Sequence, residues 1–162
     1  MRDTASMTRK SGPTDRQKLG MVEHIAFDMG QLARQHALVP NGTARSAAET
    51  ASLYSFLLHA RNLLGFYFPP PPKDQRDGDV FAADYVEGFE VEGAPDDERI
   101  SAVRKGISTR VAHICVLRME KVSWPISDYF TVLTSARDSF LKQLPLAYRS
   151  EFLRYGVHHR TW

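Results

Sequence analysis

Several features that would assign a function directly are missing from this sequence. The only cysteine among the 162 residues is Cys115, which excludes a disulfide within the chain and a metal site built from several cysteines. No segment reaches the roughly 18 consecutive apolar residues that a membrane-spanning helix needs, and the N-terminal region contains no hydrophobic secretory core. We therefore expect a cytoplasmic protein that has no contact with a membrane.

Glycine-rich phosphate loops and a strongly biased charge are absent as well. The glycines lack the spacing and the strand context of a nucleotide-binding loop, and the net charge is only +2. With 43% hydrophobic and 25% charged residues, the composition is that of an ordinary globular protein. It excludes a disordered chain and a strongly basic nucleic-acid binder. We expect one domain, with neither a metal ion nor a cofactor.

Apolar residues recur at helical spacing through most of the chain, and no alternating run predicts a β-sheet. Residues 1–14 show no such period, so we expect a disordered N-terminal arm there. A helical-bundle domain is expected over residues 15–157, and a C-terminal tail over residues 158–162. The predicted fold class is all-α. The expected helices, with approximate ends, are 15–37, 46–66, 79–86, 95–121, 125–144 and 146–155.

The expected ends of these helices follow from caps and prolines. Ser46 is a suitable N-cap, and Glu49 three residues later completes a capping-box pattern. Four prolines, Pro69 to Pro72, end this second helix, because proline lacks the amide donor that a helix needs. The connections are short enough for antiparallel neighbours, which predicts an antiparallel four-helix-type bundle with additional short helices.

One arginine lies within the apolar pattern of the second helix. At 100 degrees per residue, Arg61 is about 40 degrees from Leu57 around the helix, so the pattern predicts that it points into the core. An unpaired charge in the core costs several kcal/mol, so Arg61 requires a partner there. Asp79 and Asp84 are the nearest acidic residues in sequence that the proline-rich connection can bring back over the helix. They predict a structural ion pair with Arg61.

A second interpretation of Arg61 is catalytic. If the second and fourth predicted segments pack side by side, Arg61 and Asn62 lie near His113. A neutral imidazole can take the proton from a ribose 2′-hydroxyl while an arginine stabilises the charge that develops on the phosphate. These groups are the minimum for RNA cleavage without a metal ion.

The pair Arg61-Asn62 in an apolar helix, followed by further bundle helices, resembles the HEPN superfamily of small all-helical proteins. The signature of that superfamily is an arginine, a polar residue, and a histidine that follows the arginine after four to six intervening residues. The first two elements are present here, whereas the expected histidine is replaced by the aromatic stretch Phe66 to Phe68. The resemblance implies a dimeric protein that binds RNA or another phosphate ligand and carries a degenerate RNase motif.

Two alternatives remain open at this stage. The first is a non-catalytic interaction or regulatory module, in which Arg61 is buried in an ion pair and a protein partner is bound elsewhere. The second resembles DinB-like bundles, with a metal ion held by His24, His59 and His113 from three different helices. The phosphate-binding interpretation predicts that Arg61 is exposed in a cleft at a two-fold dimer interface. The interaction module predicts a buried salt bridge from Arg61 to Asp79 or Asp84 and no cleft near His113.

Overall fold

The computed structural model of the chain describes residues 11–44, 46–111 and 124–157. These residues form α-helices joined by loops and two short 3-10 turns, with no strand among them. The all-α prediction is therefore confirmed. The helices are α1 (Asp15–Leu38), α2 (Ala47–Tyr67), α3 (Asp97–Val111), α4 (Ile126–Gln143) and α5 (Leu146–Arg154), and the 3-10 turns are η1 (Pro72–Asp74) and η2 (Ala82–Asp84).

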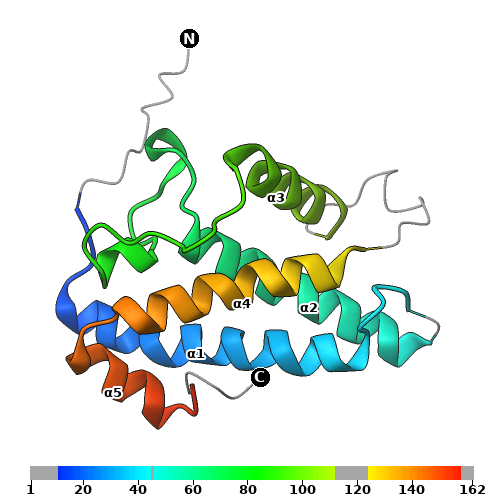
Figure 1. Cartoon of the computed structure of the whole chain (residues 1–162), viewed down its shortest axis with the longest axis horizontal. Coiled ribbons are helices and arrows are strands. Elements are labelled where there is room, and N and C mark those ends of the chain that lie inside the picture. Colours follow the sequence, from blue (N-terminus) through cyan, green and yellow to red (C-terminus); the bar gives the residue numbers. More distant parts are fainter. Residues whose placement is uncertain (1–10, 45, 112–123, 158–162) are drawn as a thin grey trace.

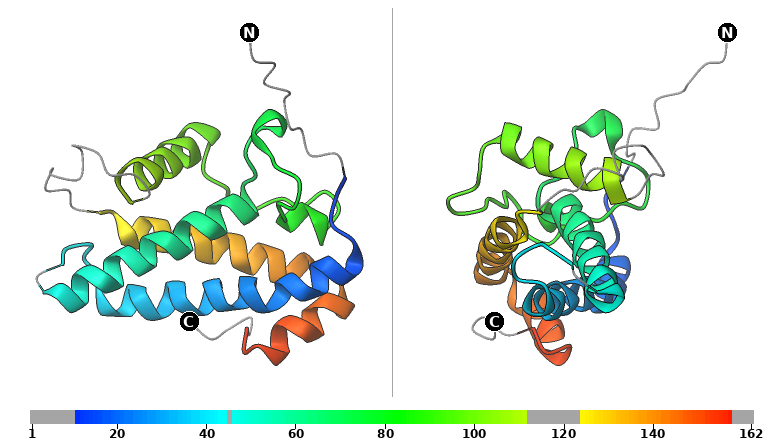
Figure 2. Two further views of the ribbon diagram at one scale, coloured as in Figure 1. Left: turned by 180° about the vertical axis from the view of Figure 1, so that it is seen from behind. Right: turned by 90° about the vertical axis from the view of Figure 1, so that its right-hand side faces the viewer.

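The helix α2 is the centre of the bundle, because it packs against α1, α3 and α4. Figure 1 shows α1 and α4 side by side along the long axis, with α2 behind them; α2 and α4 run in the direction opposite to α1. The two views of Figure 2 show that α3 crosses this group obliquely, while α5 lies against α1 at the far side. Among the described helices, none is both long and apolar enough to cross a membrane.

The starts of the first two helices are determined by local side chains. The Thr14 hydroxyl accepts a hydrogen bond from the Gln17 amide, and the Gln17 side chain accepts one from the Thr14 amide. In α2 the Ser46 hydroxyl accepts a hydrogen bond from the Glu49 amide at 3.1 Å, so the predicted N-cap is confirmed. Such caps satisfy amides that have no partner inside the helix.

The helix predicted over residues 79–86 is reduced to the single turn η2. The Asp79 carboxylate accepts from the Arg76 amide at 2.7 Å, and the Asp84 carboxylate accepts from the Phe81 amide at 2.8 Å. Aspartates that bond nearby amides in this way compete with helix formation. The predicted helix over 95–121 is observed as α3 up to Val111, and its remaining part lies outside the described residues.

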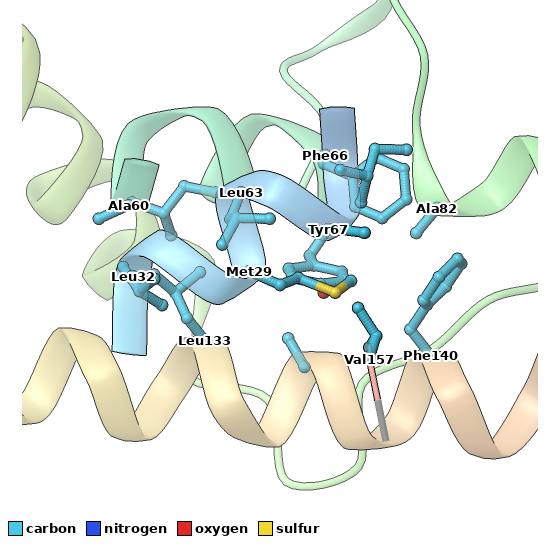
Figure 3. Packing of buried hydrophobic residues seen from close by; sticks show 14 of the residues in the cluster. Met29, Leu32, Ala60, Leu63, Phe66, Tyr67, Ala82, Leu133, Phe140 and Val157 are labelled. Atoms are coloured by element: carbon cyan, nitrogen blue, oxygen red, sulfur yellow. The ribbon is translucent and has the colours of Figure 1, made fainter. Parts of the chain in front are cut away.

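Aromatic side chains fill one end of the core, between α2, α4, α5 and the loop around η2. Figure 3 shows Phe66 and Tyr67 of α2, Phe140 of α4 and Ala82 of η2 in this part of the core. Phe140 of α4 is completely buried, and its ring meets those of Phe66, Phe152 and Tyr85 edge-on at 5.2 to 5.8 Å between centroids. Edge-to-face contacts of this kind add to the stabilisation that apolar burial provides. The Tyr85 hydroxyl donates to the Lys18 carbonyl at 2.7 Å, so the η2 loop is also held to α1.

A close backbone contact joins the loop after α1 to the start of α4. Gly42 has a φ of 65°, and a Cβ at this position would collide with the carbonyl of Trp124. The Ser127 hydroxyl of α4 donates to the Pro40 carbonyl in the same region. Glycine is required here because the loop and the chain before α4 approach too closely for a side chain.

Candidate functional site

The structure corrects the predicted orientation of Arg61, which is exposed to solvent. Among the apolar residues of α2, Leu57 and Leu64 are buried, whereas Leu58 is 47% exposed and Tyr54 38% exposed. The helix α2 carries apolar residues on nearly all sides, so their spacing alone did not define the buried face. That face is centred on Phe56, Ala60 and Leu63.

The predicted buried ion pair of Arg61 with Asp79 or Asp84 is therefore wrong. Both aspartates accept hydrogen bonds from backbone amides of their own loop, and Arg61 is on the surface. A buried arginine does exist, at Arg137 of α4, which is only 7% exposed. Its Nε and Nη2 atoms donate to one carboxylate oxygen of Asp138, at 2.9 and 2.6 Å.

Arg61 lines a groove between α1, α2, α3 and the loop over residues 70–81. The groove has a volume of about 740 Å³, which lies within the range of small-molecule and cofactor sites in proteins. Asn62 and Asp79 line it together with Arg61. Arg61 and Asn62 of the α2 motif therefore share one open site, and Asp79, one of the predicted ion-pair partners, belongs to the same site.

A polar contact between α1 and α2 forms part of the groove wall. The Asp28 carboxylate of α1 lies 2.6 Å from Nδ1 of His59, and it accepts from the side-chain amide of Asn62 at 3.2 Å. An ionised carboxylate can accept hydrogen bonds but cannot donate them, so Nδ1 of His59 carries the proton in this contact. The side chain of His59 is 10% exposed and that of Asp28 is 19% exposed. Asp28 is thus held in place by two donors from α2.

Groups of other chemical types surround this contact. Phe27 is 57% exposed, lines the groove, and meets the His59 ring edge-on at 5.7 Å. Arg104 of α3 also lines the groove and donates to the Phe68 carbonyl. Burial lowers the pKa of Arg104 below its ordinary value, although a guanidinium stays protonated in proteins. The groove therefore combines two cations, two carboxylates and an accessible aromatic ring.

Gly65 widens the groove on its α2 side. It is the only glycine in α2, it lines the groove, and a Cβ placed on it would meet no atom within 4 Å. Glycine inside a helix costs about 1 kcal/mol relative to alanine. No packing constraint accounts for glycine here, so its effect is to leave open space beside Arg61 and Asn62.

The other predicted site residues have different outcomes. His113 lies outside the described residues. His24 lines the groove and His59 contacts Asp28, but in the described part of the chain no group of three or more histidine, cysteine or acidic residues is placed to hold a metal ion. Sequence reasoning missed Asp28, because its contact with His59 spans 31 residues. Its only local signal was a carboxylate directly before the buried Met29.

Comparison of this chain with family models, with characterised proteins and with solved structures finds no match.

Proposed function

We propose that this chain is an HEPN-like RNA-binding protein and that the groove beside Arg61 holds a phosphate group of the RNA. The observation that carries the proposal is the position of Arg61, whose exposed guanidinium lines an open groove rather than the core. Guanidinium groups match the geometry of phosphate oxygens and remain charged at every physiological pH. Arg104 supplies a second positive charge on the α3 side of the groove.

The aromatic ring in the groove favours a single-stranded nucleic acid over free phosphate. Single-stranded RNA is commonly bound by stacking of its bases on aromatic side chains, while its backbone follows nearby positive charges. Phe27 provides an exposed ring within the same groove as Arg61. Gly65 leaves further open space on the α2 side of this groove.

RNA cleavage would be a catalytic form of the same function, through Arg61, Asn62 and His113. Asn62 and Arg61 are neighbours in the groove, and the Asn62 amide is bonded to Asp28. The histidine of the HEPN signature is replaced within α2 by an aromatic stretch, which favours binding over catalysis. The interaction-module alternative required a buried Arg61 ion pair, and Arg61 is exposed.

The proposal is tested by fluorescence anisotropy with a labelled single-stranded RNA of mixed sequence and the full chain. We expect Arg61→Ala to weaken binding roughly tenfold, because one phosphate contact is lost, and to make the affinity less dependent on salt. The matched control is Arg34→Ala, since Arg34 is an exposed arginine of α1 that does not line the groove. Equal losses in the two variants would show that only net charge matters and would reject the groove as the site.

A steric variant tests the same groove without changing its charge. Gly65→Ala places a methyl group in the open space of the groove and is expected to weaken RNA binding several-fold. Gly30→Ala is its control, because Gly30 is a glycine of α1 that also has open space around it and does not line the groove.

Gel analysis of the same RNA with the unmodified chain, Arg61→Ala and His113→Ala shows whether cleavage accompanies binding.

A further inference from the structure

The carboxylate of Asp28 is unusual for a site that binds an anion. It lines the groove that contains Arg61, where a negative charge repels phosphate. The carboxylate is nevertheless held firmly, by Nδ1 of His59 at 2.6 Å and by the Asn62 amide at 3.2 Å. Two carboxylate oxygens offer about four acceptor positions, and the two donors from α2 leave acceptor capacity beside the open groove.

We propose that Asp28 is the specificity-determining residue of this groove and that it accepts hydrogen bonds from a pair of adjacent donors on the ligand. This inference rests on the proposed function, because it concerns the nucleotide whose phosphate contacts Arg61. Two parts of an RNA strand present such a pair: the N–H groups on the Watson–Crick edge of guanine and the 2′- and 3′-hydroxyls of the ribose at the 3′ end. Both have the same chemistry toward a carboxylate, which accepts two parallel hydrogen bonds.

The arrangement on α2 places the two kinds of recognition next to each other. Asn62, which positions Asp28, directly follows Arg61 in the sequence, and both side chains line the groove. A ligand that reaches both Arg61 and Asp28 must carry a negative group together with hydrogen-bond donors. A nucleotide meets this requirement, whereas an anionic polymer without hydroxyl or amine groups offers no donors to the carboxylate.

The contact with His59 keeps the carboxylate in one orientation. The His59 ring is 10% exposed and is held at its edge by the ring of Phe27. A carboxylate of fixed orientation discriminates strongly between ligands. When a ligand displaces the water around the carboxylate but carries no matching donors, the lost hydrogen bonds are not replaced, and binding is weakened. We therefore assign His59 and Asn62 as positioning residues and Asp28 as the residue that contacts the ligand.

The experiment uses hexanucleotides of sequence UGUGUG and UAUAUA, each in ribose and deoxyribose forms, in the same anisotropy assay with the full chain. Preference for UGUGUG in both sugar forms identifies the guanine edge as the donor pair, and preference for both ribose forms identifies the hydroxyls. We expect a preference of about tenfold along one of these two axes. Equal affinity for all four oligonucleotides overturns the inference and leaves the proposed function intact.

The variant Asp28→Asn separates hydrogen bonding from simple charge. Removing a negative charge beside Arg61 strengthens the attraction of the groove for phosphate, so general electrostatics predicts tighter binding. We expect the opposite: binding of the preferred oligonucleotide weakens about tenfold and the preference is lost. The control Glu23→Gln makes the same charge change at an exposed position of α1 outside the groove and leaves the preference unchanged.

Three results distinguish the two proposals. Unchanged or tighter binding by Asp28→Asn, with the fold verified by circular dichroism, overturns the role of Asp28 while Arg61 can still bind phosphate. RNA binding that does not depend on Arg61 rejects the proposed function itself. If Asp28→Asn fails to fold, the four-oligonucleotide comparison on the unmodified chain still decides, because the inference requires a preference there.

Discussion

The two faces of α2 differ in solvent exposure, although both contain leucines. One face, centred on Phe56, Ala60 and Leu63, is completely or almost completely buried against α1 and α4. The other face exposes Leu58, Arg61 and Asn62 and lines the groove over part of its length. Leucines occur on both faces, so residue type alone does not distinguish them.

The difference between the faces lies in what covers them. The buried face is covered by α1 and α4, and its apolar side chains leave water, which is the largest favourable contribution to folding. The groove face is covered only in part, by α3 and the loop over residues 70–81. A chain can therefore keep charged and polar groups on the second face with little cost in stability, and these groups are available for binding.

Neighbouring leucines give the largest expected contrast between the two faces. Leu57 is completely buried, and Leu58 is 47% exposed. We expect Leu57→Ala to lower the free energy of unfolding by about 2–5 kcal/mol, because it removes buried methyl groups and leaves a cavity. Leu58→Ala is expected to change it by only about 0.5 kcal/mol. Urea denaturation measures both, and similar losses in the two variants would contradict the observed orientation of α2.

A pair of arginines tests the same comparison with charged residues. Arg137 of α4 is 7% exposed and is bonded twice to Asp138, whereas Arg61 is exposed in the groove. We expect Arg137→Ala to lower the free energy of unfolding by about 1.5–3 kcal/mol, from lost charged hydrogen bonds and packing. Arg61→Ala is expected to leave it within about 0.5 kcal/mol. A large loss from Arg61→Ala in urea denaturation would restore the interpretation of Arg61 as a buried ion pair.

The partly buried ring of His36 gives the smallest expected effect. His36 of α1 stacks on Phe130 at 4.0 Å between ring centroids and has Phe56 of the buried face nearby. Its Nε2 atom is buried without a hydrogen-bond partner among the described residues. Burial therefore lowers the pKa of His36 below its ordinary value of 6.5.

The lowered pKa of His36 makes stability depend on pH in a definite direction. Below about pH 6.5 the unfolded chain binds a proton at His36 more readily than the folded chain does. The free energy of unfolding therefore falls as the pH decreases through this region and is fully regained above it. His36→Phe, which keeps a ring against Phe130, is expected to reduce this acid sensitivity, as measured by thermal denaturation between about pH 5 and pH 8. An unchanged pH profile would show that other groups cause it.

Helix positions were largely predictable from the sequence, because they depend on local patterns. The predicted helices over 15–37, 46–66, 125–144 and 146–155 each agree with an observed helix to within one or two residues. Caps and prolines act within a few residues of the helix ends that they determine, as Ser46 does for α2. The prediction over 79–86 was wrong because two aspartates bond to loop amides there instead of allowing a longer helix.

The candidate site was predictable only in part. The sequence identified Arg61 and Asn62 as residues that required an explanation, and the structure places both in one groove. Asp28 and His59 were not linked to them, because their contact joins two helices and leaves no trace in the local spacing. Arg137 was missed for a similar reason, since its burial depends on how α4 packs against the rest of the bundle.

The sequence by itself determined the all-α class, the boundaries of α1, α2, α4 and α5, and the presence of an arginine in an apolar helix. These properties follow from interactions between residues that are close in the chain: helical spacing, caps and prolines. Only the tertiary structure decided which side of α2 is buried, because that helix is apolar on nearly all sides and its orientation depends on α1 and α4. Because of this orientation of α2, Arg61 lies in the groove and not in the core. It faces solvent there and lines the same groove as the Asp28 carboxylate, which is held by two donors from α2.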